Sequence, residues 1–338
     1  MRPTTTGASA SALSADPPLA ARVPLDLLDR RLLFVTGKGG VGKTTVASGL
    51  ALLAARQGRR TLVCQSDAKG DLADAYEVSG LEFAPREVQP HLFAMAMDTE
   101  SSLREYLRLQ LKLPLVAKVG PLARAFDFIA NAAPGVKEVL TVGKYVWEVR
   151  ERHYDLVVVD AVASGHIVGQ LAAPQAINQL VQVGVVRNQT SWMLDILSDP
   201  AQTGVVVVAS PEEMPVNESL ELAARIRDET TVDLAAVVVN RVLPELFGRG
   251  EEEVFVRLRR PERVVALSGA VGGDVGPVLD AAELAVTLRR TGAGHLATLR
   301  AGLPPALAML YLPYLFSRAV GLRATHRIAE ALAEELGR

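Results

Sequence analysis

The stretch from Gly37 to Thr45, which has the sequence GKGGVGKTT, constrains the fold more than any other part of this 338-residue chain. It follows the apolar run Leu32 to Thr36, which is typical of a buried parallel strand, and from Thr44 onward apolar residues recur at helical spacing. Glycines let backbone N–H groups point inward around phosphate oxygens, and the N-terminus of the helix adds partial positive charge. The order strand, glycine turn, helix therefore predicts a phosphate-binding loop.

The loop carries two lysines with different predicted roles. Lys43 is placed to reach the β- and γ-phosphates of a nucleoside triphosphate, and the Thr44 hydroxyl to ligate Mg²⁺. Lys38 follows the first glycine and indicates a nucleotide-dependent dimer, because a cation supplied across an interface accelerates phosphoryl transfer by about 10³- to 10⁵-fold. A solvated lysine on a glycine turn is the alternative. The predicted nucleotide-binding residues are Gly37, Lys38, Gly39, Gly40, Val41, Gly42, Lys43, Thr44 and Thr45.

Apolar, β-branched runs alternate with helical patterns along the rest of the chain. Strands that are separated by helices imply crossover connections and a parallel sheet, so we predict an α/β fold with a doubly wound, mostly parallel sheet. In such sheets ligands bind at the carboxyl ends of the strands. The further strands are predicted at 61–66, 92–97, 156–160, 205–210, 235–240 and, with a weaker pattern, 309–312.

Two aspartates lie at predicted strand ends. Asp67 follows the second strand and Asp160 ends the fourth. A carboxylate beside a triphosphate can hold Mg²⁺ through its waters or orient the water that attacks the γ-phosphate, whereas either aspartate alone is also typical of a helix N-cap. Their position downstream of a phosphate-binding loop favours two nucleotide-sensing loops.

Composition limits the function classes. The chain is 49% hydrophobic and 22% charged with a net charge of −2, which gives no electrostatic signature of nucleic-acid binding. We predict a leader without regular structure over 1–28 and one ATPase-type domain over 29–338, with a helical subdomain inserted at 100–150. Cys64 is the single cysteine and is expected to be a packing residue in a reducing, cytoplasmic setting.

Three motifs in order carry a family resemblance. These are Lys38 in the glycine loop, a segment from Asp67 to Tyr76, and a segment from Asp160 to His166 that ends in Ser-Gly-His. Together they resemble the deviant-Walker ATPases, and within that class the branch of the arsenite-pump (ArsA) and guided-entry tail-anchored-protein targeting ATPases. The resemblance runs from about Arg31 to the C-terminus.

The resemblance implies a magnesium-dependent, dimeric ATPase that converts ATP and water to ADP and phosphate. It implies that Lys38 reaches the partner's phosphates, that Asp67 positions the hydrolytic water, and that Asp160 senses the γ-phosphate and Mg²⁺. Asn240 matches the family's adenine-recognising residue, and Pro313 lies in the place of the loop that packs on the base; a surface turn is the alternative for this loop. The catalytic residues are thus expected to be Lys38, Lys43, Asp67 and Asp160.

The chain also departs from the family. The first switch usually reads D-P-A-H and the second D-T-A-P-T-G-H, whereas this chain has Ala68-Lys69-Gly70 after Asp67 and Ala161-Val162-Ala163 after Asp160. Loss of the prolines is expected to loosen both loops, so hydrolysis is expected to be slow or partner-tuned. One cysteine per subunit is too few for the zinc site at the dimer seam of eukaryotic targeting ATPases.

Several questions about partners stay open at this point. The apolar residues of the 100–150 region indicate either a groove for a hydrophobic client helix or ordinary core and dimer packing. The dimer could pair two copies or a copy with a paralogous ATPase. We expect an ATP-driven dimer switch that acts on a hydrophobic client or membrane partner. The alternatives are a weakly hydrolysing regulatory subunit of a heterodimer and a partitioning or site-selection ATPase.

Overall fold

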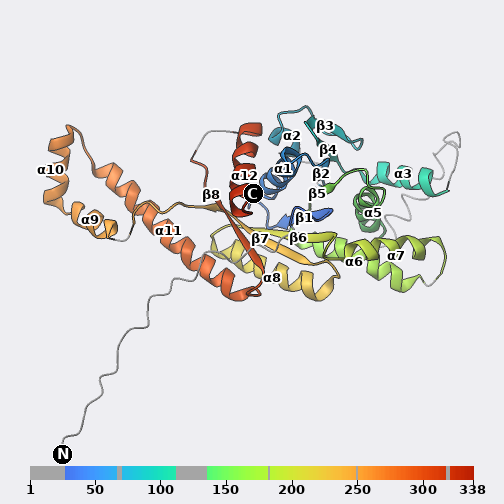
Figure 1. The fold of residues 1–338 in the computed structure, drawn as a ribbon. Coiled ribbons are helices and arrows are strands. Elements are labelled where there is room, and N and C mark those ends of the chain that lie inside the picture. The colour runs from blue at the N-terminus through green and yellow to red at the C-terminus, as the bar shows by residue number, and fades with distance from the viewer. Residues whose placement is uncertain (1–26, 67–70, 112–134, 182, 249, 317–319) are drawn as a thin grey trace, which may run out of the picture.

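Within the part of the chain that the structure describes, eight strands form one central sheet with helices on both faces (Figure 1). The structure is a computed structural model and describes residues 27–66, 71–111, 135–181, 183–248, 250–316 and 320–338. The strand order is β3-β4-β2-β5-β1-β6-β7-β8, in which β3 is antiparallel to β4 and all other neighbours are parallel. The predicted α/β class with a mostly parallel sheet is confirmed. The strands are β1 (Leu32–Gly37), β2 (Thr61–Gln65), β3 (Arg86–Gln89), β4 (Leu92–Ala96), β5 (Leu156–Asp160), β6 (Thr203–Ala209), β7 (Leu234–Val242) and β8 (Ala308–Pro313).

Alternate residues of the central strand β1 enter two separate cores. Leu33 and Val35 pack with α1, α2 and α12 on one face, and Leu32 and Phe34 pack with α5, α6 and α8 on the other. Parallel strands that are apolar on both faces need helices on both sides to exclude water. The described helices are α1 (Lys43–Arg56), α2 (Asp71–Ala75), α3 (Thr99–Leu111), α5 (Val136–Arg150), α6 (Ser164–Leu180), α7 (Val185–Leu197), α8 (Glu213–Glu229), α9 (Glu251–Leu258), α10 (Pro261–Val271), α11 (Gly276–Gly302) and α12 (Gly321–Glu335).

The predicted strands agree with the observed ones to within two residues at each end, and one strand was missed. β3 (Arg86–Gln89) carries no fully buried residue and pairs antiparallel to β4 at the edge of the sheet. A half-exposed edge strand needs no continuous apolar run, and its sequence REVQ lacks one. Periodicity therefore gave no signal for it.

The packed domain starts slightly earlier than the predicted boundary at residue 28. Leu27 is 6% exposed and Leu28 is 1% exposed, and both belong to the core beside α1 and α12. The two leucines assigned to the leader are therefore structural residues of the domain. The rest of the predicted leader lies outside the described residues.

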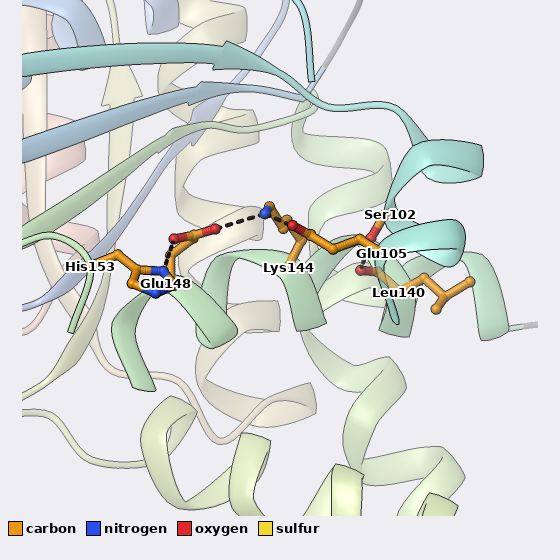
Figure 2. Close-up of polar contacts among 6 residues, drawn as sticks. All are labelled: Ser102, Glu105, Leu140, Lys144, Glu148 and His153. Carbon is orange, nitrogen blue, oxygen red and sulfur yellow. Dashed lines mark hydrogen bonds and ion pairs between the residues drawn. The ribbon is translucent and has the colours of Figure 1, made fainter. Parts of the chain in front are cut away.

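An ion cluster centred on the buried Lys144 fastens α3 to α5 within the predicted helical subdomain (Figure 2). Lys144 Nζ lies 2.6 Å from Oε2 of Glu105 on α3 and 2.7 Å from Oε1 of Glu148, which is one turn further along α5. Glu148 also contacts Nδ1 of His153 at 2.7 Å. Burial lowers the pKa of Lys144, but the two carboxylates raise it by more, so its pKa lies above the ordinary value. The start of the subdomain is thus joined to the helix that covers β5.

Most of the apolar residues that suggested a client groove, from Tyr106 to Phe128, have side chains outside the described set. Of those that are described, Leu103 is 8% exposed and packs inward. The structure therefore leaves both interpretations of the 100–150 region standing.

A helical arm projects from the sheet in the region between β7 and β8 (Figure 1). It consists of α9, α10 and the first half of α11, and α10 buries none of its residues. Eight of the sixteen large apolar residues that are exposed in the described structure lie between Leu246 and Leu288. No helix among the described residues combines the length and the apolar character that crossing a bilayer requires. We refer to residues 251–288 as the arm.

Candidate nucleotide site

The predicted phosphate-binding loop connects β1 to α1 and has the backbone geometry that its glycines allow. Gly37 has φ 151°, and a Cβ there would lie 2.3 Å from the carbonyl oxygen of Val208 on β6. Gly42 has φ 97° at the start of α1. A Cβ at Gly39 or Gly40 would meet no atom within 4 Å, so the space beside this part of the loop is open. The loop therefore presents its backbone to an open face, as phosphate binding requires.

Thr44 and Asp160 meet at the end of the loop. Thr44 Oγ1 donates a hydrogen bond to Asp160 Oδ2 at 2.7 Å, and the Asp160 residue is only 7% exposed. The contact joins the first turn of α1 to the end of β5, which neighbours β1 in the sheet. A hydroxyl beside a carboxylate is the oxygen donor set that Mg²⁺ prefers, so these residues fit the predicted ion. The structure thus brings together two residues that are 116 positions apart.

The two lysines of the loop lie differently. Lys43 Nζ is 3.4 Å from the carbonyl oxygen of Lys38, so its ammonium group lies back along the loop. Lys38 Nζ instead lies 2.5 Å from Oε1 of Glu218 on α8, and both side chains are partly exposed. Lys38 is therefore directed toward a helix outside its own loop. Sequence reasoning found no local partner for it and did not identify Glu218.

Asn240 fastens the loop to β7. Its Nδ2 donates to the carbonyl oxygen of Val41 at 2.9 Å, its Oδ1 accepts from the backbone N–H of Arg241 at 3.0 Å, and the residue is 4% exposed. A Cβ on Gly42 would lie 2.3 Å from this Nδ2. In this conformation the amide serves the loop backbone, a role that the predicted adenine contact did not include.

Pro313 lies on the same edge of the sheet as Asn240. It ends β8 and pairs with Val242 of β7, and the backbone N–H of Tyr314 donates to the Val242 carbonyl oxygen at 2.8 Å. Pro313 is exposed, and the Tyr314 ring packs against that of Phe316 with a centroid separation of 4.9 Å. The predicted base-contacting residues thus share one region at the carboxyl ends of β7 and β8.

The backbone after Asp160 is held by β1 although the family's proline is missing there. Thr36 Oγ1 donates to the carbonyl oxygen of Val162 at 2.9 Å, and the N–H of Ala161 donates to Val35 at 2.9 Å. Thr36 is fully buried and directly precedes the glycine loop. The loosening that the substitutions predicted is therefore opposed at Ala161 and Val162.

Asp67 lies outside the described residues. The chain on either side of it is placed, however. The N–H of Ser66 donates to the Asp160 carbonyl oxygen at 3.0 Å. After α2, the buried Tyr76 donates its hydroxyl to the Ser48 carbonyl oxygen of α1 at 2.9 Å. The predicted first switch is thus preceded by Ser66, which is hydrogen-bonded to Asp160, and followed by Tyr76, which is anchored to α1.

Cys64 is a buried packing residue, as expected. It is fully buried in the core beneath α5, and burial raises the pKa of its thiol well above the ordinary value. A thiol in this state is a poor nucleophile and a poor metal ligand.

Comparisons with known proteins agree with this geometry. The family model described as anion-transporting ATPase matches residues 30–195 and 183–255, together more than half of the chain. ATPase BagA of Mycobacterium tuberculosis is 29% identical over 337 residues, covering 92% of this chain and 95% of that protein.

Two further relatives match smaller parts of the chain. A putative arsenical pump-driving ATPase of Halobacterium salinarum is 28% identical over 263 residues, covering 71% of this chain and 39% of that protein. ATPase GET3 of Chaetomium globosum is 30% identical over 173 residues, covering 51% of each chain. With the glycine loop and the Thr44–Asp160 contact in place, these matches show that the chain belongs to the anion-transporting ATPase family.

Proposed function

We propose that this protein is an ATP-hydrolysing switch in which ATP binding closes a dimer and hydrolysis opens it, and that the dimer acts on a hydrophobic client or membrane partner. The observation that carries the proposal is the arrangement of the glycine loop. Thr44 lies 2.7 Å from Asp160, whereas the additional lysine, Lys38, is directed out of the loop toward α8. A lysine that does not face its own phosphate site can serve another subunit's site once its contact with Glu218 opens.

Within one subunit the roles follow from position. Lys43 would bind the β- and γ-phosphates. Thr44 and Asp160, which lie 2.7 Å apart, would hold Mg²⁺. When bound, Mg²⁺ neutralises charge that develops on the phosphate oxygens. Asp67 orients the attacking water, and Asn240 and Pro313 border the base. Lys38 of the second subunit completes the positive charge around the γ-phosphate.

The arm supports the part of the proposal that concerns a hydrophobic client or membrane partner. Its apolar side chains include Val265 at 73% exposed, Val278 at 69% and Leu284 at 59%. Val265 lies on α10, and Val278 and Leu284 lie on α11. Apolar side chains that are exposed on projecting helices are available for contact with a partner. The 100–150 region remains the second candidate for client contact. A weakly hydrolysing partner subunit is favoured by one observation, the replacement of the second-switch residues by Ala161, Val162 and Ala163.

The test is to measure the mass of the purified protein by light scattering with Mg²⁺ and either ADP or a non-hydrolysable ATP analogue, and to measure its ATPase turnover. We expect a dimer with the analogue, a smaller dimer fraction with ADP, and turnover by the protein alone. A monomer in both nucleotides without turnover contradicts the homodimeric switch. In that case co-purification in the analogue, followed by identification of the retained chains, tests for a paralogous partner.

A further inference from the structure

The ion pair between Lys38 and Glu218 lies outside every role assigned above. Lys38 Nζ is 2.5 Å from Glu218 Oε1, and the two residues are 180 positions apart. The contact therefore depends on the packing of α8 beside the loop. On the same helix Val216 is 1% exposed and Ser219 is 2% exposed, so α8 is fixed against the sheet and holds the carboxylate in place.

The ion pair with Glu218 restrains a lysine that would act in a second subunit. A bound carboxylate neutralises the ammonium charge and keeps Nζ on the α8 side of its own subunit. Lys38 can stabilise a partner's γ-phosphate only after this contact opens. A triphosphate with several anionic oxygens attracts an ammonium more strongly than one carboxylate, so a partner's bound ATP can displace Glu218.

We propose that Glu218 is a positioning residue that holds Lys38 in the resting subunit and releases it when two subunits close on ATP. This inference rests on the proposed function, because it requires Lys38 to act across a dimer interface. The Lys38 side chain is 25% exposed and that of Glu218 36% exposed, so the pair is partly solvated. Such a pair shifts an equilibrium by about two- to fivefold, which is enough to set the ATP requirement without preventing closure.

The experiment measures the concentration of the non-hydrolysable analogue, with Mg²⁺, that gives half-maximal dimer in the full-length protein. We expect Glu218→Gln to lower this concentration by about two- to fivefold, because the hold on Lys38 is removed while the shape of the side chain is kept. Glu218→Asp keeps the carboxylate and should return toward the wild-type value. Glu221→Gln is the matched control, since Glu221 is an exposed carboxylate one turn along the same helix. It should leave the midpoint unchanged.

The Lys38→Ala background separates this inference from the proposed function. If Glu218 acts through Lys38, Glu218→Gln changes nothing once Lys38 is absent. An unchanged or raised midpoint in Glu218→Gln alone, or the same gain in the Lys38→Ala background, overturns the holding role. If Lys38→Ala itself dimerises and hydrolyses ATP as the wild type does, the proposed function fails instead. Thermal unfolding of each variant shows that the midpoints compare folded proteins.

Discussion

Replacing Gly42 by alanine should be costly, and most of the excess cost should depend on Asn240. Gly42 has φ 97°, a conformation that costs an L-residue about 1–2 kcal/mol. The new Cβ would also lie 2.3 Å from Asn240 Nδ2. The amide can swing away only by breaking its buried 2.9 Å hydrogen bond to the Val41 carbonyl oxygen, which costs about 1–3 kcal/mol. We expect Gly42→Ala to lower the free energy of unfolding by about 2–5 kcal/mol.

A double-mutant cycle measured by urea unfolding isolates the second part of this cost. Asn240→Ala alone should cost about 1–3 kcal/mol, because the same hydrogen bond is lost. In that background Gly42→Ala should cost only the backbone part, so the double variant is more stable than additivity predicts by about 1–3 kcal/mol. Gly40→Ala is the control, since Gly40 has φ 86° but open space around its Cβ position. Its effect should add to that of Asn240→Ala, and additivity for Gly42→Ala as well would refute the reasoning.

Three further predictions concern single side chains. Thr44→Ala should reduce ATPase turnover by at least about tenfold and abolish its dependence on Mg²⁺. Thr44→Ser keeps the hydroxyl near Asp160 and should retain most turnover. Equal turnover in both variants would exclude the assigned role. Lys144→Met should destabilise the fold by about 3–5 kcal/mol in thermal or urea unfolding, because Glu148 is left buried without its cation, while Lys144→Met/Glu148→Leu should recover much of that loss. Since the pKa of Lys144 is raised above 10.5, its stabilising effect is present below that pH and is lost as the pH rises through the folded-state pKa, so the wild type should lose stability at alkaline pH and the double variant should lose less. Cys64 should react with a thiol-alkylating reagent only at the rate of unfolding, because burial raises its pKa well above the ordinary value; rapid labelling of the folded protein would contradict its packing role.

The sequence predicted those parts of the fold that depend on local pattern. β1, the glycine loop and α1 follow from apolar spacing and glycine chemistry, and Asp160 follows from the rule that ligands gather at strand ends. Glu218, Thr36 and the loop-binding role of Asn240 could not be predicted in this way. Their partners lie 126 to 199 positions away, so only the tertiary arrangement pairs them.

The helical arm illustrates a second limit of sequence analysis. Residues 243–305 carry no motif and no clear periodic pattern, so the sequence alone predicts no elements there. In the structure Gly269 lies inside α10, and a turn occupies only the residues between Val271 and Gly276. α10 buries none of its residues, so it has no buried face that an apolar stripe would mark in the sequence.

Mixing two inactive variants tests the central claim, a lysine that acts across a dimer, most directly. Lys38→Ala keeps its own Lys43, and Lys43→Ala keeps its own Lys38, so each variant alone should be inactive. If Lys38 acts in the partner's site, an equal mixture should regain about a quarter of wild-type ATPase turnover, since about half of random dimers are mixed and each holds one intact site. A mixture that stays as inactive as its parts would contradict the account and place Lys38 in its own subunit's site.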